Sequence, residues 1–379
     1  MRKIIKYVDK PLLIVSVILF IFGLIMVFSA SNVIAYMSHE VSASYYFIKQ
    51  AAFLIAGAIL TIIMLRFTTK SYGVLSWALL ILFSISLVIL LIFIAPKNKA
   101  QSWFDLGPIS IQPSEFIKVI IIVWLAYFYE LKHKKLNTYA TSLFPIFICL
   151  GIALLIFLQP DLGTTIIFCA IVAAIFFAVP IAKEIKKRTF LMALGLVAFV
   201  AVIFIGTGSQ LLQSRQLERF DFFRPCDKLL TTGNQVCNCY IAINNGGLTG
   251  TGLGNSTQKY LYLPEPYTDF IFAIIVEELG VLTGIGLILA YIFILYRILL
   301  IGRNSPTNRG ATMCYGVAIY IFLHIAVNLL GIFGLMPMTG VPLPFMSYGG
   351  SFTICLIAAL AIVQRVSVEN GIAKEREVK

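Results

Sequence analysis

The sequence predicts an all-α polytopic membrane protein with about ten transmembrane helices and one large extracytoplasmic loop between the seventh and eighth spans. Of the 379 residues, 60% are apolar and only 12% are charged. The mean hydropathy is +0.94, and it comes from long apolar runs that are each close to the roughly 20 residues needed to cross a bilayer. No soluble domain, linker or short repeat interrupts these runs, so residues 1–379 are expected to form a single membrane domain.

Ten apolar runs predict the spans, and basic residues gather in alternate connections between them. The runs are Pro11–Ala30, Ala51–Arg66, Tyr72–Pro96, Ser114–Tyr129, Ser142–Leu158, Thr164–Pro180, Thr189–Thr207, Thr268–Leu295, Gly310–Leu335 and Ser351–Gln364. With ten spans the basic connections share one side, which the positive-inside rule makes the cytoplasm, with both termini inside. The net charge of +12 is therefore read as topology rather than as nucleic-acid binding. The first run lacks a small-residue cleavage site and is read as an anchor, not a signal peptide.

The outward loop, residues 208–267, is the only sizeable aqueous element that the sequence predicts. Its many aromatic residues argue against disorder, so we expect a folded cap resting over a cavity. Three of the seven cysteines lie in it, and Cys226 could form a disulfide with either Cys237 or Cys239. The C-x-C spacing does not favour a zinc site.

Asp269 stands at the mouth of the eighth span and is the main candidate for chemistry. A carboxylate beside apolar membrane segments is costly to keep, which makes it a functional candidate. The alternative interpretation is a helix N-cap. Glu277 and Glu278 follow about two turns deeper, and at most one of them shares a helix face with Asp269. A second buried carboxylate must therefore find a partner elsewhere in the bundle.

Two further polar segments fall on the same outward side. In Trp103–Lys118, Glu115 and Lys118 are spaced i, i+3 in the first turn of a span, so they can pair. The pair could simply neutralise two boundary charges, or it could bind an anionic, hydroxyl-rich headgroup beside the Trp103 ring. In Gln159–Thr165, Asp161 is placed to cap the following helix.

A third polar segment, Pro337–Ser351, opens the last span with the residues SYGGS. Backbone N–H groups at such a helix start can face an anion, which suits a pyrophosphate, and Ser347 and Ser351 are the candidate contacts. Close helix packing requires the same small residues, so both interpretations stay open. His324, in the ninth span, is expected to be an interhelical hydrogen-bonding residue rather than a metal ligand.

Taken together, these segments resemble a known family. The motifs are W-F-D-L-G…Q-P-S-E-x-x-K (Trp103–Lys118), Q-P-D-L-G-T (Gln159–Thr164), G-G-L-x-G-x-G-L-G-N-S-x-Q-K (Gly246–Lys259), L-P-E-x-x-T-D-F-I-F-A…E-E-L-G (Leu263–Gly280) and G-V-P-L-P-x-x-S-Y-G-G-S (Gly340–Ser351). In this order and over essentially the whole chain, they resemble the SEDS (shape, elongation, division and sporulation) family of bacterial membrane glycosyltransferases, the FtsW/RodA/SpoVE group. The segment GLGNSTQK is closer to the division or sporulation branch of the family than to the elongation branch. The segment Cys237–Leu248 departs from the family pattern.

The resemblance implies a peptidoglycan glycosyltransferase that polymerises lipid II at the outer face of the cytoplasmic membrane, in septal cell-wall synthesis during cell division. It implies a divalent cation, Mg or Mn, as cofactor. The implied partners are a class B penicillin-binding protein acting as transpeptidase and other divisome proteins. Asp269 would be the essential acidic residue, as general base or as metal ligand. The implied substrate-binding residues are Trp103, Glu115, Lys118, Gln258, Lys259, Ser347 and Ser351.

The residues fit this chemistry on physical grounds. Joining two sugars requires a base that takes the proton of the acceptor hydroxyl, and a cationic group that holds the departing lipid pyrophosphate. Asp269 and Lys118 are the residue types needed. The alternatives are a flippase that moves lipid II across the membrane and a scaffold that activates the partner transpeptidase. A flippase would need polar gates on both faces, whereas the polar segments predicted here crowd one face.

Overall fold

The computed structural model describes residues 2–37, 41–93, 102–107, 110–206, 225–228, 233–260 and 262–377. The described part is mainly helical, with one two-stranded antiparallel hairpin, β1 (Phe104–Asp105) and β2 (Ser110–Ile111). The helices are α1 Arg2–Tyr7, α2 Lys10–Met37, α3 Tyr45–Met64, α4 Thr69–Phe93, α5 Pro113–Leu131, α6 Tyr139–Phe157, α7 Leu162–Ala178, α8 Lys183–Gly206, α10 Asn234–Gly246, α11 Ile271–Arg303, α12 Asn308–Ile332 and α13 Gly350–Glu377, with short 3-10 turns at η1 His133–Lys135 and η2 Pro225–Lys228.

The all-α, multi-pass architecture is confirmed. Each predicted span overlaps one helix, although residues 94–96 and 207, at the ends of two predicted spans, lie outside the described residues. Seven helices in the described part are long and apolar enough to cross a membrane: α2, α3, α4, α6, α11, α12 and α13. Helix α7 is apolar but has only 17 residues. Helices α5 and α8 carry charged residues near their starts. The count of ten spans therefore stays a prediction.

Helix α5 is the centre of the bundle. It is buried along almost its whole length and packs against α4, α6, α7, α12 and α13. A helix that is apolar all round needs such complete cover, and α5 has this character from Val119 to Tyr129. The central position is what carries the charged first turn of α5, with Glu115 and Lys118, into the interior of the protein.

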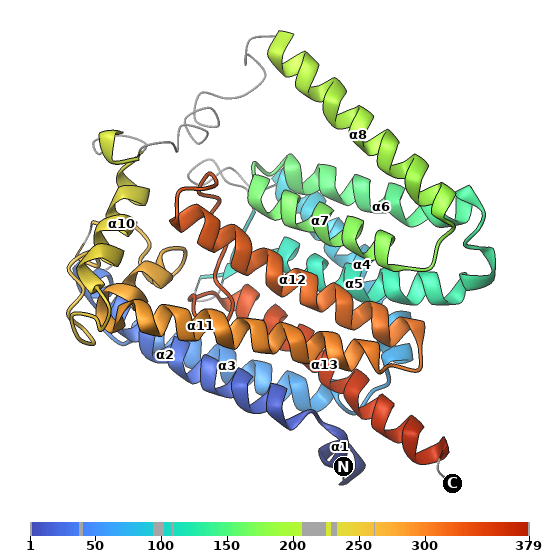
Figure 1. Ribbon diagram of the computed structural model, residues 1–379, viewed down its shortest axis with the longest axis horizontal. Coiled ribbons are helices and arrows are strands. Elements are labelled where there is room, and N and C mark those ends of the chain that lie inside the picture. The colour runs from blue at the N-terminus through green and yellow to red at the C-terminus, as the bar shows by residue number, and fades with distance from the viewer. Residues whose placement is uncertain are drawn as a thin grey trace.

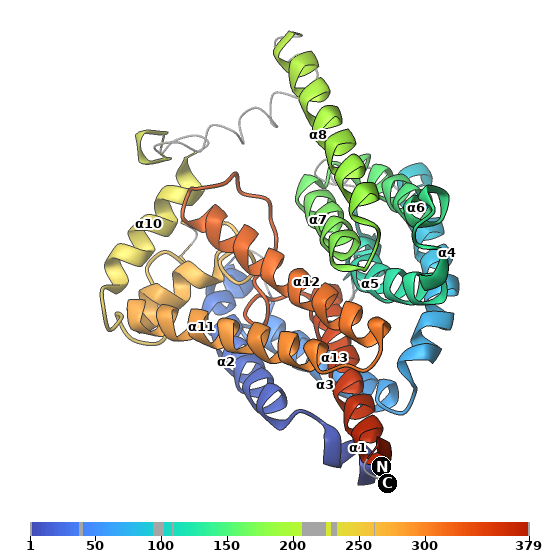
Figure 2. The same ribbon diagram turned by 45° about the vertical axis from the view of Figure 1, so that its right-hand side comes forward.

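The bundle has two distinct ends. Figure 1 shows the two termini together at one end and α10 at the other. Helix α8 leans away from the other helices in both Figure 1 and Figure 2. Its first half contacts α7, where the rings of Phe177 and Phe190 lie 6.2 Å apart.

Helix α11 is broken at Gly280, which has φ 84° and ψ 165°. The sequence predicted an uninterrupted span there. The glycine-rich loop after α10 supplies the hydrogen bonds that the break leaves open: Val281 N donates to Gly247 O at 2.9 Å, and Thr251 N donates to the Glu277 carbonyl at 3.0 Å. A Cβ atom at Gly280 would lie 2.2 Å from Leu248 O, so this close approach of two backbones requires glycine.

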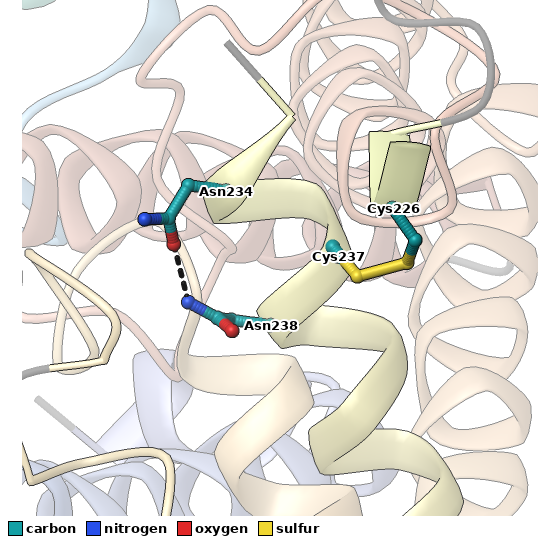
Figure 3. The surroundings of a disulfide bond; sticks show 4 residues. All are labelled: Cys226, Asn234, Cys237 and Asn238. Carbon is teal, nitrogen blue, oxygen red and sulfur yellow. Dashed lines mark hydrogen bonds between the residues drawn. A yellow bond between two sulfur atoms is a disulfide. The ribbon is translucent and has the colours of Figure 1, made fainter. Parts of the chain in front are cut away.

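A disulfide joins Cys226 in η2 to Cys237 in α10, which settles the two pairings that the sequence left open (Figure 3). Cys239 is free and buried. One turn of α10 is further held by Asn238, whose Nδ2 donates to Asn234 Oδ1 and to Tyr262 O at 2.5 and 2.8 Å. The predicted folded cap is described only in part, because residues 208–224, 229–232 and 261 lie outside the described residues.

Candidate functional site

A cavity of about 340 Å³ opens at the end of the bundle that carries α10. The four outward polar segments predicted from the sequence all contribute to it. Its lining residues are Ser102, Trp103, Gln112, Glu115, Lys118, Pro160, Asp161, Leu162, Thr164, Glu265, Thr268, Asp269, His324, Thr339, Gly340, Val341, Pro342, Tyr348, Gly349 and Phe352. Segments that are far apart in the sequence therefore converge on one chamber, as predicted.

Asp269 lies at the edge of this cavity, two residues before α11. Its backbone is fixed from α12, because Asn328 Nδ2 donates to Asp269 O at 2.8 Å and to Val341 O at 2.8 Å. The N-cap position belongs to Phe270, and no side-chain cap bond forms there, so the capping interpretation of Asp269 is wrong.

The carboxylate of Asp269 is left free to act. It has no hydrogen-bond partner in the described part of the chain, and Gly340 lies next to it, since a Cβ atom there would be 3.4 Å from Oδ2. Burial, with a smaller contribution from the nearby charge of Glu265, raises the pKa of Asp269 to about 7. A carboxyl group with a pKa near neutrality can take up and release a proton under physiological conditions.

Glu115 and Lys118 form a buried ion pair deeper in the cavity. Lys118 Nζ donates to Glu115 Oε1 at 2.8 Å, and both side chains are almost fully buried. The i, i+3 pairing predicted from the sequence is thus confirmed. Glu115 Oε2 is buried without a hydrogen-bond partner among the described residues. An open acceptor of this kind, beside a lysine, offers a contact to a ligand hydroxyl or amide.

His324 completes this group from α12. Its Nδ1 lies 2.8 Å from Tyr320 O, and its Nε2 lies 3.0 Å from Lys118 Nζ. Because the carbonyl can only accept, Nδ1 carries the proton and Nε2 accepts from the lysine. The interhelical hydrogen-bonding role predicted for His324 is confirmed, and the structure adds that its partner is Lys118. Sequence spacing gave no signal for this contact, since the two residues are 206 positions apart.

The rim of the cavity is held together by Gln112. Gln112 N donates to Ser351 Oγ at 3.0 Å, and Gln112 Nε2 donates to Asp161 Oδ2 at 3.0 Å. Asp161 Oδ1 accepts from Thr164 N at 3.0 Å, which confirms its predicted capping of the following helix, α7. Trp103, 44% exposed, stands at the mouth. Sequence reasoning missed Gln112, although it directly precedes the proline that starts α5.

The two serines of the SYGGS segment are placed beside the cavity rather than in its lining. Ser347 Oγ donates to Thr268 O at 2.6 Å, which ties the last polar segment to the residue before Asp269. Ser351 Oγ accepts from Gln112 N. Both hydroxyls are therefore engaged in fixing the site, and direct binding of substrate by Ser347 and Ser351 stays a prediction.

Gln258 and Lys259 lie in a separate buried cluster around Glu277 and Glu278. Lys259 Nζ pairs with Glu278 Oε1 at 2.9 Å, and Gln258 N donates to Glu277 Oε2 at 3.3 Å. Ser29, Ser256 and Thr257 also donate hydroxyl groups to these carboxylates. The expected partners of the deeper carboxylates are thus found in the loop. Neither Gln258 nor Lys259 reaches the cavity lining, so their substrate-binding role also stays a prediction.

The cavity lining is acidic on formal charges. Its described residues include the carboxylates of Glu115, Asp161, Glu265 and Asp269 and a single ammonium group, that of Lys118. In the described part of the chain, no three His, Cys, Asp or Glu side chains are arranged to hold a metal ion. The protein residues alone therefore do not form a metal site, and no reaction step is assigned to a cation.

Fold and site define a multi-pass membrane protein with a polar, carboxylate-rich cavity at one end of its helix bundle. The FTSW_RODA_SPOVE family, described as "Cell cycle protein", matches residues 10–372. This chain belongs to that family.

Named relatives match over nearly the whole chain. The probable peptidoglycan glycosyltransferase FtsW of Bacillus subtilis (strain 168) is 35% identical over 374 residues, covering 97% of this chain and 92% of the relative. Stage V sporulation protein E of the same organism is 34% identical, covering 95% and 96%. The probable peptidoglycan glycosyltransferase FtsW of Haemophilus influenzae is 35% identical, covering 96% and 91%.

Solved structures share the fold. A chain from a study of structural coordination of polymerization and crosslinking by a peptidoglycan synthase complex has a TM-score of 0.75 at 22% identity, covering 96% of this chain and 98% of that chain. The rod shape determining protein RodA of Thermus thermophilus has a TM-score of 0.65 at 21% identity, covering 95% and 96%. These likenesses show that the chain shares this fold over about 95% of its length.

Proposed function

We propose that this protein is a peptidoglycan glycosyltransferase that polymerises lipid II into glycan strands at the outer face of the cytoplasmic membrane, in septal wall synthesis. Family membership and the names of relatives at about 35% identity support the activity. The observation that carries the assignment of the site is Asp269, a carboxylate with a pKa of about 7 and no hydrogen-bond partner in the described chain, at the edge of the cavity.

Asp269 is the carboxylate best suited to act as general base. Asp161 accepts hydrogen bonds on both oxygens, and Glu115 is held by Lys118 through Oε1. A carboxylate oxygen that already accepts a hydrogen bond or forms an ion pair must give up that contact before it can take the proton of a substrate hydroxyl. Among the carboxylates of the lining, Asp269 therefore combines an accessible oxygen with a pKa near the working pH.

The reaction follows from this arrangement. Asp269 takes the proton of the acceptor sugar hydroxyl as that oxygen attacks the anomeric carbon of the donor. The bond between the anomeric carbon and the pyrophosphate oxygen breaks, and lipid pyrophosphate leaves with the electron pair. A single displacement inverts the anomeric centre. The leaving group is already a good one, so no second carboxylic acid is required to protonate it, in contrast to glycoside hydrolysis.

Lys118 supplies positive charge beside the reaction centre, and Trp103 supplies an aromatic face at the mouth for a sugar ring. One lysine against four carboxylates leaves the lining acidic, which disfavours a pyrophosphate on its own. This supports the divalent cation, Mg or Mn, as part of the proposal, because Mg²⁺ is commonly held by one or two carboxylates together with substrate phosphates.

The proposed partners are a class B penicillin-binding protein and other divisome proteins. One solved structure with this fold comes from a peptidoglycan synthase complex, which supports a protein partner. The proposed orientation places both termini in the cytoplasm. It is supported by the basic connections near the termini and by the disulfide at the opposite end of the chain's fold, since disulfides persist in oxidising compartments.

The test is glycan synthesis from purified lipid II by the full-length protein with its cognate transpeptidase, with and without divalent cation. We expect Asp269→Asn to abolish polymer formation. Asp227→Asn, the same chemical change at an exposed aspartate outside the cavity, is the matched control and should keep wild-type activity. If Asp269→Asn makes strands at the wild-type rate, the assignment of the base is wrong. If wild type makes no polymer but translocates lipid II in liposomes, the protein is a flippase.

A further inference from the structure

A second polar pocket, of about 420 Å³, lies at the end of the bundle that carries both termini. It is formed where four segments meet: α1 with its connection, the start of α2, the end of α11 and the last turns of α13. The candidate functional site is at the other end, so the proposed glycosyl transfer does not use this pocket. Charged residues flank apolar spans here, which places the pocket at a boundary between membrane and water.

The pocket is cationic. Four basic side chains line it, those of Lys6, Lys10, Arg297 and Lys374, against one carboxylate, Asp9. Asp9 is fully engaged: it pairs with Arg297 and also accepts from Leu12 N at 2.9 Å. The charge of Arg297 is thereby neutralised within the fold.

Two of the remaining cations are not neutralised. Lys6 lies 3.6 Å from Glu375, whereas Lys10 and Lys374 have no ion-pair or hydrogen-bond partner among the described residues. Two exposed ammonium groups from different helices thus line one concave surface without an ion-pair partner among the described residues. The excess of basic residues at this end of the protein explains why the two side chains are positively charged. It does not explain why the surrounding segments form a pocket around them.

The pocket is built by specific contacts rather than by loose loops. Ser367 Oγ donates to Tyr7 O at 3.0 Å, and the Tyr7 ring packs on Gly371, where a Cβ atom would lie 2.3 Å from the ring. Helix α1 is thereby fixed on α13. The neighbouring side chain of Ile5 is 67% exposed, as expected of a short segment that lies in the interfacial region of a bilayer.

One uncharged group in the lining also lacks a partner. Asn370 is 8% exposed, and its Nδ2 donates to Ile301 O at 3.0 Å, while its Oδ1 has no hydrogen-bond partner among the described residues. A buried acceptor without a donor is costly unless a ligand supplies one. The pocket therefore fits an anion that also carries a hydroxyl group.

We propose that this pocket binds the phosphate of an anionic phospholipid with a hydroxylated headgroup, with Lys10 and Lys374 as the charge contacts. Phosphatidylglycerol has the required chemistry, a phosphodiester next to glycerol hydroxyls. Basic pockets between transmembrane helices at the membrane surface are suited to such headgroups. The lipid would hold α1, α2, α11 and α13 together at this end of the bundle.

The experiment uses the full-length protein and three forms: wild type, Lys10→Gln/Lys374→Gln, and the control Lys134→Gln/Lys135→Gln. The control removes two exposed charges from the connection between α5 and α6. Each protein is reconstituted in vesicles of mixed phosphatidylglycerol and phosphatidylcholine. The protein is then released from the vesicles, and native mass spectrometry measures the ratio of the two lipids that remain bound to it.

We expect wild type and control to retain phosphatidylglycerol selectively. In the pocket variant, Lys10→Gln/Lys374→Gln, the preference for phosphatidylglycerol over phosphatidylcholine should fall about 30-fold, because each basic side chain near an anionic surface contributes about a fivefold factor. Equal unfolding temperatures in pure phosphatidylcholine would show that all three forms are folded. An unchanged preference in the pocket variant, or an equal loss in the control, overturns the proposal.

A second arm separates the lipid from a soluble anion. Inorganic phosphate is added to the wild-type protein in phosphatidylcholine, with chloride at matched ionic strength as reference. If phosphate alone raises the unfolding temperature as much as phosphatidylglycerol does, the ligand is a soluble phosphate and the lipid assignment is wrong. No effect of phosphate, together with retention of phosphatidylglycerol, supports the headgroup.

Discussion

His324 Nε2 lies 3.0 Å from Lys118 Nζ, across the contact between α12 and α5. The histidine proton is fixed on the other ring nitrogen by Tyr320 O, so the imidazole is neutral and accepts from the lysine. The ring is clamped between Tyr320 and Phe352, at centroid distances of 4.5 and 4.9 Å. His324 therefore positions the one ammonium group of the cavity lining.

Replacing His324 should misplace Lys118. We expect His324→Leu to lower kcat/KM for glycan synthesis by about 10-fold or more, because a hydrogen bond to a charged group is worth about 1.5–3 kcal/mol. His324→Gln keeps an acceptor and should recover part of the loss. The exposed His133→Gln is the control. Equal activity of the Leu and Gln variants would show that the contact does not position the lysine.

The pH profile of polymerisation should report the ionisation of Asp269. The pKa of this group is raised to about 7, and a general base acts only when ionised, so the rate should rise with pH and reach half of its plateau near pH 7. The charge of Glu265 contributes to this raised pKa, so Glu265→Gln should move the midpoint to lower pH. A rate that is flat between about pH 5 and 8 would exclude Asp269 as the titrating base.

The buried pair of Lys259 and Glu278 should dominate the stability of the glycine-rich loop. Both side chains are inaccessible to solvent, so Lys259→Met leaves an unpaired buried carboxylate, at a cost of about 3–5 kcal/mol. The exposed pair of Arg188 and Glu184 offers the comparison, and Arg188→Gln there should cost less than about 1 kcal/mol. Thermal unfolding in one detergent measures both. Similar shifts in the two variants would contradict the prediction.

Replacing each of two glycines of α11 by alanine should change the stability of the protein in different ways. Gly280→Ala places a side chain at φ 84° and ψ 165° and against Leu248 O, so we expect a loss of about 2 kcal/mol or more. Gly286 is helical with nothing within 4 Å of a Cβ atom, so Gly286→Ala should be neutral or stabilising by about 0.5–1 kcal/mol. The difference between the unfolding temperatures of the two variants tests whether α11 is broken at Gly280. A tolerated Gly280→Ala would argue for a continuous helix.

Local rules explain what the sequence could predict. The span at α5 follows from the apolar run Ser114–Tyr129, and the pairing of Glu115 with Lys118 follows from their i, i+3 spacing. The cap formed by Asp161 follows from a short acidic residue before an apolar run. Alternating basic connections also placed the polar segments at one end of the bundle, which brought Trp103 and Asp269 to one cavity.

Contacts between distant segments could not be predicted in the same way. The break at Gly280 lies in a run that reads as one apolar helix, and it depends on backbone groups of residues 247–252. Lys259 pairs with a carboxylate on α11, away from the cavity, whereas the family motif implied that it binds substrate. The contact of His324 with Lys118 depends on how α12 crosses α5, which a period of 3.6 residues does not encode.

The disulfide between Cys226 and Cys237 also provides a way to measure the orientation of the protein in the membrane. The other five cysteines are free, and four of them are buried. A reductant that cannot cross the bilayer would therefore release the exposed thiol of Cys226 for labelling only when it is added to the compartment that α10 faces. Intact cells and inverted vesicles would give opposite patterns without any engineered tag, so the orientation of the whole bundle can be read from one native bond.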